Sequence, residues 1–384
     1  MDNLPVADSP RSQLLEELMR DFAQRTGPDA GGPPRRYLWT DAFAVCNFLG
    51  LYRRHGEGLQ LDLALRLVHQ VHHVLGRHRP DDSRTGWISG LDEDEGERHP
   101  TRGGLRIGKE FPERGSREPY DPQAEWDRDG QYFHYLTQWM HALLRVSQET
   151  GDLRYLRWAG ELALAAHAGF TLRAISGAPR LAWKMSIDLH RPLVPSMGHH
   201  DPLDALITYL ELQDAGAETV GADLRAAIAD ADCMCAGASW ATDDALGIGG
   251  LLLDATRLAS LIARHGVERR DLWVQLLQES ATSLRAFDRS DPLSLPPQHR
   301  LAFRELGLAI GLGAAELRKD LLATIDGAAA PALDVVLRHL PLAERIERTW
   351  ADPRARASAL WLAHRDINDV MLATSLAPEG LLGP

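Results

Sequence analysis

The apolar residues of this chain recur at helical spacing almost from end to end, and the helical segments come in pairs. Residues 41–54 are joined to a second helical segment, ending near residue 78, by the turn His55-Gly56-Glu57-Gly58. Glycine after a helix supplies the left-handed residue that ends it, which explains this punctuation. Further pairs are 129–150 with 152–172, 200–212 with 222–233, 247–264 with 271–287, and 298–312 with 314–325. The pattern predicts an all-α fold, with residues 181–193 as the best candidate for a short extended piece.

The two ends of the chain supply a sixth pair. A helix over residues 365–376 is expected to pair with one over residues 11–26, which closes six helical hairpins into a circle. Residues 331–363 are further helical material with no place in this scheme. We expect residues 1–384 to form a single domain, because a chain of this length can bury a sizeable core.

In five of the six pairs the first helix carries Asp at its N-terminal end, and aromatic or His residues accompany it. Asp at a helix start is ordinarily an N-cap, and Asp201-Pro202 has the form of a cap followed by a first-turn proline. Capping does not explain the Trp and His residues, or why only alternate helices are marked. If the marked helices form the inner ring, their N-termini converge on one mouth lined with carboxylates and aromatic rings.

Together these features resemble the (α/α)6 toroid of the six-hairpin glycosidase-like class. The hairpin rhythm carries the resemblance, as does the turn Thr150-Gly151-Asp152-Leu153-Arg154-Tyr155-Leu156, which is similar to turns that open outer helices in these barrels. The class includes glycoside hydrolases, unsaturated glucuronyl hydrolases and the N-acylglucosamine 2-epimerase family. No family-defining catalytic motif matches, so the site must be argued from the residues themselves.

A long segment without helical spacing, residues 79–125, separates the first hairpin from the second. A connection of this length inside a compact domain is usually functional, and we interpret it as an inserted active-site loop at the mouth. Its glycines, between residues 103 and 108, follow no predicted strand and lack phosphate-loop spacing, so no nucleotide site is expected.

Two clusters hold the candidate catalytic carboxylates. Glycosidic cleavage needs one protonated carboxylic acid and one carboxylate. The predicted pair is Asp127 or Asp129 with Asp201 or Asp204. Tryptophan rings stack on the C–H face of a pyranose, and polar groups fix its orientation. The predicted substrate-binding residues are Trp39, Asp41, Trp87, Arg106, Trp126, His134, Trp183, Lys184, His199, His200 and Asp243.

Three functions from different classes remain open. The first is a glycoside hydrolase that uses the paired Asp residues; an unsaturated-uronide hydrolase is a variant, with Arg106, Arg128 or Lys184 available for the substrate carboxylate. The second is a sugar epimerase or isomerase in which His134, His199 and His200 act as acid and base. The third is a non-catalytic helical scaffold that binds a partner or a sugar.

Charge and composition narrow the partners. Lys plus Arg is 42 and Asp plus Glu is 54, a net charge of −12, which disfavours nucleic acid and anionic membranes. The three cysteines, the absence of a secretory signal in residues 1–10 and the lack of a long apolar run favour a cytoplasmic protein. We expect a small saccharide substrate, no cofactor and no metal, since His199, His200 and Asp204 lack further ligands at proper spacing. Oligomeric state has no signature in the sequence.

Overall fold

The expected helices are present in the computed structural model, which describes residues 9–27 and 34–383. Most of residues 1–10, in which no secretory signal is expected, lies outside this part. The chain divides into two compact units, which we describe separately. The N-terminal unit comprises residues 26–49 and 59–238, and the C-terminal unit comprises residues 1–25, 50–58 and 239–384. The expectation of a single domain over residues 1–384 stays a prediction.

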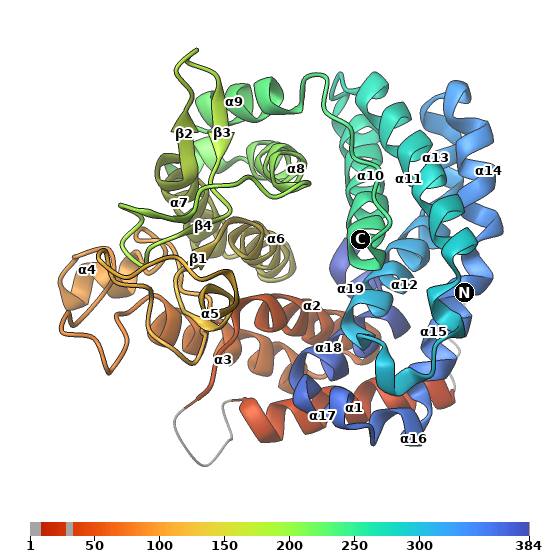
Figure 1. The fold of residues 1–384 in the computed structure, drawn as a ribbon, viewed down its shortest axis with the longest axis horizontal. Helices are drawn as coiled ribbons and strands as arrows, with labels where there is room; N and C mark the ends of the chain where they lie inside the picture. The colour runs from red at the N-terminus through yellow and green to blue at the C-terminus, as the bar shows by residue number, and fades with distance from the viewer. Residues whose placement is uncertain (1–8, 28–33, 384) are drawn as a thin grey trace. The chain divides into compact units, whose positions relative to one another are not determined.

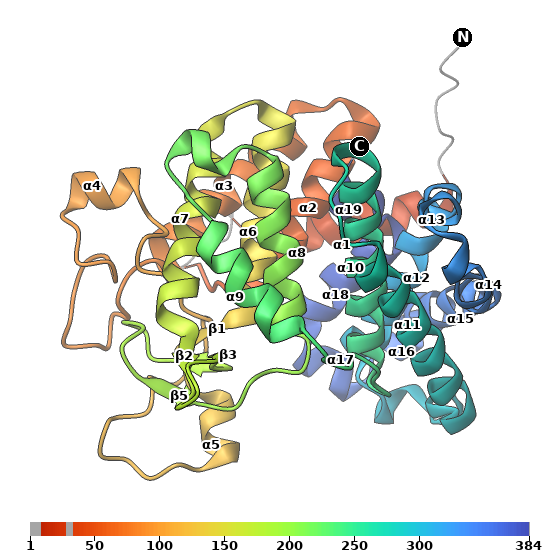
Figure 2. The same cartoon turned by 90° about the horizontal axis from the view of Figure 1, so that it is seen from above.

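The N-terminal unit is built from long helices, which are connected by short turns in some places and by long segments in others. Its long helices are α2 (Leu38–His55, of which residues 38–49 belong here), α3 (Gly58–Leu75), α6 (Phe133–Thr150), α7 (Leu153–Phe170), α8 (Asp201–Asp214) and α9 (Arg225–Cys235). Figure 2 shows α6, α7, α8 and α9 side by side. The α6–α7 turn shows why the chain reverses here. Gly151 adopts a left-handed conformation and closes α6, and the Asp152 side chain accepts the Arg154 N–H and opens α7.

Short strands connect these helices where extended structure was expected. β1 (Gln131–Tyr132), β4 (Lys184–Met185) and β5 (Pro192–Val194) form an antiparallel sheet in the order β1-β4-β5. β2 (Thr171–Arg173) pairs with β3 (Pro179–Leu181) in a separate hairpin. β1 immediately precedes α6, so the small sheet fixes the N-terminal end of that helix.

The long segment between α3 and α6 contains little regular structure. It includes α4 (Glu93–Arg98) and α5 (Pro122–Asp127). Buried side chains anchor it to the unit, and the largest is Trp87, which is 2% exposed. Figure 1 shows α4 and α5 in orange and gold within this segment.

The C-terminal unit holds the remaining helices. They are α1 (Pro10–Thr26), α10 (Ala245–His265), α11 (Arg270–Ser290), α12 (Ala302–Leu317), α13 (Lys319–Ile325), α14 (Ala330–Arg338), α15 (Leu340–Ala351), α16 (Pro353–Arg356), α17 (Ala359–Ala363), α18 (Arg365–Leu376) and α19 (Glu379–Leu382). In Figure 1, α10, α11 and α14 run side by side. α10 and α12 meet at glycines. A Cβ added to Gly249 would lie 2.0 Å from the Gly307 carbonyl oxygen, so only glycine permits this approach.

The first and last helices pair as predicted. Arg11, at the start of α1, donates to the backbone carbonyl of Leu376 at the end of α18. Arg25, at the end of α1, contacts Asp366 and Asp369 at the start of α18. The two helices are therefore antiparallel.

One predicted pair is wrong. Residues 314–325 were expected to form the partner of the 298–312 helix, but α13 has seven residues and α12 packs against α10, α15 and α18 far more than against α13. α15 lies within the 331–363 stretch that the pattern could not place. Its Trp350 is buried and donates through Nε1 to Glu305 of α12 at 2.9 Å. An apolar helix face of this length covers α12 better than a two-turn helix does.

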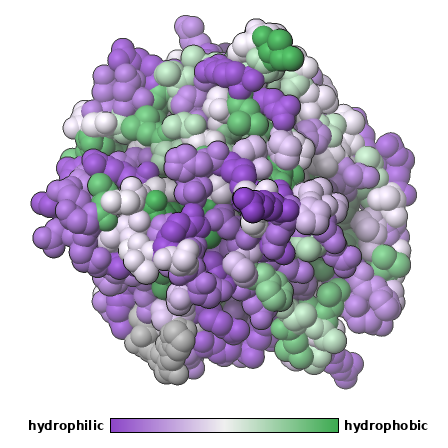
Figure 3. Space-filling view, turned by 60° about the vertical axis from the view of Figure 1, so that its left-hand side comes forward, coloured by the Kyte–Doolittle hydropathy of each residue, from purple (hydrophilic) through white to green (hydrophobic). Residues whose placement is uncertain are grey.

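One described helix is a candidate membrane span by length and composition alone. α10 is the one helix of the described residues long and apolar enough to span a bilayer, and 78% of its most apolar window is buried, as is usual for a core helix. On the face seen in Figure 3, hydrophilic residues prevail and hydrophobic residues form small separate groups.

Candidate functional site

Aromatic side chains from separate segments of the N-terminal unit meet at the N-terminal ends of α2 and α6. We call them the aromatic cluster: Tyr37, Trp39, Trp126, Tyr132, His134, Tyr135 and Trp183. Most of its members are partly exposed, Tyr132 is buried, and the Trp126 side chain is 49% exposed. Rings that are only partly covered by protein can stack on a ligand.

Ring contacts link the cluster from end to end. The Trp39 ring lies 5.8 Å from the His134 ring and 5.3 Å from the Tyr135 ring, measured between centroids. The Trp183 ring lies 5.3 Å from that of Tyr132 and 6.2 Å from that of Trp126. Aromatic residues that lie more than a hundred positions apart in the sequence, such as Trp39 and Trp183, thus form one continuous group of rings.

The buried carboxyl of Asp201 lies next to the imidazole of His134, a member of the aromatic cluster. The Nδ1 atom of His134 lies 3.7 Å from Oδ1 of Asp201, and the Asp201 residue is 4% exposed. The His134 side chain is 23% exposed, so the ring is open on one side and faces the carboxyl on the other. Within the described residues, His134 Nδ1 and Asp201 Oδ2 are both buried without a hydrogen-bond partner. Buried polar atoms without partners are costly and are concentrated at functional sites.

The local sequence explains how Asp201 reaches this position. It was expected to cap α8, but the N-cap residue is His200, and Asp201 is the first residue of the helix. The Asp201 carboxyl turns back over Gly198, where an added Cβ would lie 2.4 Å from Oδ2. The absence of a side chain at Gly198 therefore makes room for the buried carboxyl.

Burial sets the protonation of both groups. It raises the pKa of the Asp201 carboxyl to about 7, an effect opposed by a hydrogen bond from the Gly198 backbone. Burial also lowers the pKa of the His134 imidazole to about 4. The pair thus carries at most one charge near neutral pH, and a proton moves on or off it within the physiological range.

Besides His134 and Asp201, the aromatic cluster contains a second pair of polar groups, the hydroxyls of two tyrosines. The hydroxyls of Tyr37 and Tyr135 lie 2.6 Å apart. Burial raises the pKa of Tyr37 to about 12, so this hydroxyl stays protonated and can donate a hydrogen bond. Asp41 fixes the start of α2 beside it, because its Oδ2 accepts the Tyr37 backbone N–H at 3.0 Å. Asp41 is itself 2% exposed, which gives it a supporting position beneath the cluster.

Lys109 adds a positive charge from the long segment. Its Nζ lies 5.0 Å from the centroid of the Trp126 ring and 5.5 Å from that of Tyr37. Burial lowers the pKa of this ammonium, and the nearby carboxylates of Asp127 and Asp129 oppose the shift.

Asp129, predicted to be catalytic, is enclosed. It is fully buried, and its Oδ2 accepts from Arg106 at 2.5 Å and from Arg79 at 3.4 Å. Its Oδ1 accepts the backbone N–H groups of Gly108 and Gly130, each at 3.0 Å. Asp129 and Arg106 thus tie the long segment to the start of α6, and neither has a free hydrogen-bonding edge for a substrate.

The ammonium group of Lys184 is likewise occupied by hydrogen bonds and an ion pair within the protein. Its Nζ is buried, lies 2.9 Å from Glu125 Oε1, and donates to the carbonyls of Glu125 and Arg128. Arg128 lies 2.5 Å from Glu118. The basic residues considered for a substrate carboxylate are therefore paired with internal carboxylates.

Trp87 also lies away from the cluster. Its ring is buried against Arg77, whose guanidinium lies 4.3 Å from the ring centroid, and against Gly96 and His73. These packing contacts account for the presence of Trp87 as a buried structural residue, so no role in ligand binding is needed to explain it.

The other predicted residues are distributed around these features. Asp127 is exposed at the end of α5, next to Trp126, and Asp204 is partly buried in the first turn of α8. The His199 and His200 rings are 4.6 Å apart before α8, and His199 is exposed. Asp243 belongs to the C-terminal unit, where it is exposed before Asp244, the N-cap of α10.

Sequence reasoning missed Tyr37 and Tyr135. Each is a near neighbour of a predicted residue, since Tyr37 precedes Trp39 by two positions and Tyr135 follows His134 directly. The accumulation of aromatic residues at the two helix starts was the available signal.

Comparison with known proteins gives likeness in structure without likeness in sequence. No family model and no curated protein matches the sequence. A cellobiose 2-epimerase from Spirochaeta thermophila is similar with a TM-score of 0.53 at 14% identity, covering 98% of this chain and 99% of its own. A GH76 alpha-mannanase from Bacteroides thetaiotaomicron has a TM-score of 0.54 at 8% identity over 98% of both chains. A D-mannose isomerase has a TM-score of 0.52 at 11% identity, covering 97% of this chain and 100% of its own.

These likenesses show the fold. The chain is an all-α protein with an (α/α)6 toroid fold, which confirms the fold that the hairpin rhythm predicts. The structures that share it carry names from several reaction classes, so the fold alone does not select one.

Proposed function

We propose that this protein is a carbohydrate-active enzyme that moves a proton next to a sugar carbonyl, as a sugar isomerase or epimerase does, with His134 as the base. The observation that carries the proposal is the 3.7 Å approach of His134 Nδ1 to the buried Asp201 carboxyl. A base oriented by a third group within reach is the usual arrangement of an activated imidazole.

The environment of the imidazole supports this role. Its exposed side faces the aromatic cluster, whose partly exposed rings provide a platform for a sugar ring. The hydroxyl pair of Tyr37 and Tyr135 provides protonated donors for sugar oxygens. Lys109 lies within residues 79–125 and contacts Trp126, which directly follows them, and this supports the interpretation of residues 79–125 as an active-site loop.

The reaction follows from these positions. Neutral His134 takes the proton from the carbon next to the carbonyl, and an enediol forms as the carbonyl oxygen gains a proton from a hydroxyl donor. Asp201 acts through His134: as a carboxylate it holds the imidazole and stabilises the imidazolium while it carries the proton. His134 then returns that proton to the neighbouring carbon, and the hydroxyl on the first carbon loses its own proton to the deprotonated hydroxyl donor as it becomes the new carbonyl, which gives the isomer and restores the donor. One base on one face suffices for an aldose–ketose conversion.

Asp201 fits this positioning role better than a direct role as acid, because its carboxyl is almost fully buried. Its pKa of about 7 leaves a large carboxylate fraction at neutral pH.

A glycoside hydrolase is the second candidate. It is favoured by the exposed carboxylate of Asp127, next to the exposed ring of Trp126. In this case Asp127 is the base that activates water and Asp201 is the protonated acid. Asp129 is left out of both candidates because internal partners hold both of its oxygens.

One set of variants separates the two candidates. Wild type, His134→Gln, Asp201→Asn and Asp127→Asn are incubated in D2O with free aldoses and ketoses, and separately with aryl glycosides and oligosaccharides, and the products are read by NMR. Isomerisation predicts interconversion of a free sugar that is lost in His134→Gln, reduced in Asp201→Asn and retained in Asp127→Asn.

Release of reducing sugar, lost in Asp127→Asn and Asp201→Asn but retained in His134→Gln, would replace the proposal by the hydrolase. Saccharide binding without turnover of any sugar would favour the non-catalytic scaffold. The partners we propose are a small saccharide and no nucleic acid or membrane, in keeping with the net charge of −12 and with a cytoplasmic location.

A further inference from the structure

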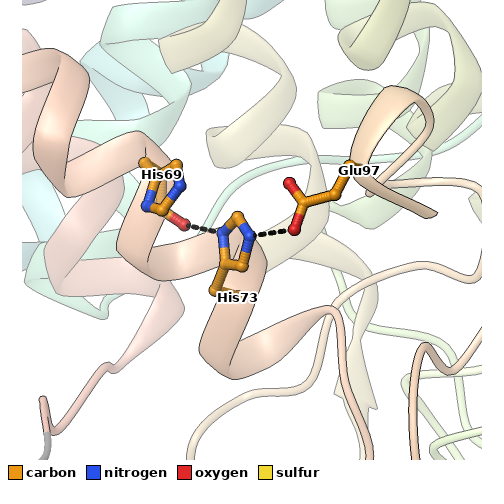
Figure 4. Close-up of side chains that lie close together, drawn as sticks. All are labelled: His69, His73 and Glu97. Atoms are coloured by element: carbon orange, nitrogen blue, oxygen red, sulfur yellow. Dashed lines mark hydrogen bonds and ion pairs between the residues drawn. The ribbon is translucent and has the colours of Figure 1, made fainter. Parts of the chain in front are cut away.

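Two histidines and a glutamate converge on the outer side of α3, away from the aromatic cluster. His69 and His73 lie one turn apart on α3, and Glu97 faces them from α4 (Figure 4). One ligand atom from each residue lies within 4.8 Å of the other two. Of the His, Cys, Asp and Glu residues in the described part of the chain, these form the group whose ligand atoms come together in this way.

The hydrogen bonds of His73 define the state of its ring. Nδ1 of His73 lies 2.8 Å from the backbone carbonyl oxygen of His69, so Nδ1 carries a proton and donates it. The opposite atom, Nε2, lies 2.5 Å from Oε1 of Glu97 (Figure 4). Nε2 of the imidazole and Oε1 of the carboxylate are both potential metal ligands, and a proton lies between them at this distance. A metal ion would replace that proton as the two ligand atoms move apart.

The chemistry of the three donors fits a transition metal. Histidines four residues apart on a helix place two nitrogens on one face, and a donated Nδ1–H is the usual outer support of a metal-bound imidazole. Two imidazoles and one carboxylate suit Zn²⁺ and its neighbours, whereas Ca²⁺ and Mg²⁺ prefer oxygen alone. Zinc holds such ligands at about 2.0–2.2 Å, and a water completes the set of four.

The adjoining charges leave the three donors available. Arg77 is the nearest cation, with its guanidinium 3.8 Å from Glu97. Its closer ion-pair partner is Glu93, and its charge also rests over the Trp87 ring at 4.3 Å. Counting Glu93, Glu97 and Arg77 gives a net charge of −1 beside the two imidazoles, which attracts a dication.

We propose that His69, His73 and Glu97 form a binding site for a divalent transition-metal ion of the zinc type, and that the ion joins α4 to α3. The Trp87 ring already connects the two elements, since a Cβ at Gly96 of α4 would lie 2.1 Å from it and the His73 ring of α3 lies 5.5 Å from it between centroids. The ion adds a bond between a rigid helix and the long segment that also supplies Lys109 and Trp126 to the aromatic cluster. The site is independent of the proposed reaction, because none of its residues belongs to that cluster.

Titration of the full-length protein with Zn²⁺ against a chromophoric chelator tests the site. The variants are His69→Ala, His73→Ala and Glu97→Gln, and His190→Ala is the matched control, because His190 is an exposed histidine outside the group. Circular dichroism verifies that each variant is folded. Hydrogen exchange of residues 91–99, with and without Zn²⁺, reports the attachment of α4.

We expect one ion per chain, at least tenfold weaker binding in each histidine variant, weaker binding in Glu97→Gln, and unchanged binding in His190→Ala. Zn²⁺ is expected to slow exchange of residues 91–99 in the wild type but not in Glu97→Gln. Equal zinc affinity in wild type and the two histidine variants would overturn the site. Unchanged affinity and exchange in Glu97→Gln would overturn the link to α4.

Discussion

The imidazole of His134 and the carboxyl of Asp201 lie 3.7 Å apart, although the remainder of α6, α7 and the four strands β2 to β5 lie between them in the sequence. His134 stands in the first turn of α6, and Asp201 is the first residue of α8. Both belong to helices whose starts carry acidic and aromatic residues. From the sequence, the starts of such helices are expected to converge, and His134 and Asp201 are one pair of residues that does so.

The pH dependence of turnover follows from the state of Asp201. Burial raises its pKa to about 7, so its carboxylate form, which supports His134 as a base, accumulates as the pH rises through 7. Because His134 has a pKa of about 4, it is already neutral over this range. We expect kcat/KM for a free sugar to rise about tenfold per pH unit below 7 and to level off above it. Asp201→Asn should abolish this rise and lower activity about a hundredfold or more. A profile that falls between pH 6 and 8 would argue instead for Asp201 as a protonated acid.

Gly198 is expected to control the position of the Asp201 carboxyl. In Gly198→Ala the new Cβ would meet that carboxyl at 2.4–2.5 Å and displace it. We expect at least a tenfold loss of turnover and a loss of about 1–3 kcal/mol in the free energy of unfolding. The matched control is Gly58→Ala, where an added Cβ meets no atom within 4 Å. Equal activity of the two variants would mean that the carboxyl position does not matter.

Asp129 is expected to determine stability. Asp129→Asn leaves the buried Arg106 guanidinium without its carboxylate, and removal of one partner of a buried pair costs about 3–5 kcal/mol. Asp81→Asn is the comparison, because Asp81 also pairs with an arginine, Arg79, but is exposed, and such pairs contribute about 0–1 kcal/mol. Urea denaturation of both variants measures the difference. A stable Asp129→Asn protein without activity would return Asp129 to the list of catalytic candidates.

Replacement of Trp87 is expected to lower stability, whereas replacement of Trp183 is expected to weaken sugar binding. Trp87→Ala removes a buried ring and should cost about 3–5 kcal/mol of unfolding free energy. Trp183→Ala removes a partly exposed ring of the aromatic cluster, and the loss of stacking, about 0.5–1.5 kcal/mol, should raise the KM for sugar several-fold. Thermal unfolding and steady-state kinetics on both variants separate the effects. The opposite assignment of the two losses would contradict the placement of the cluster.

The sequence predicted the helices well because their apolar spacing and their caps are local. The turn at Gly151 and Asp152 is an example, since a left-handed glycine and an N-cap act within a few residues. The partner of α12 could not be read in the same way. Which helix covers it depends on the length of α13 and on the burial of Trp350, both of which are set by packing.

Residue types alone could not separate working carboxylates from supporting ones. Asp127, Asp129 and Asp201 look alike in the sequence, yet one is exposed, one is enclosed by arginines and one lies against a histidine. Burial and ion pairing depend on segments far away in the chain, such as Arg106 for Asp129. The same limit hid the pairing of Glu97 with His73, because Glu97 lies in a segment without a helical pattern.

An NMR titration of the His134 imidazole, in wild type and in Asp201→Asn, tests the central claim most directly and needs no substrate. We expect the ring to stay neutral down to about pH 4, and its resonances to show a second step near pH 7 as Asp201 ionises. The second step should be absent in Asp201→Asn. A single titration at the ordinary histidine value of 6.5, identical in both proteins, would contradict the coupling of His134 to a buried carboxyl.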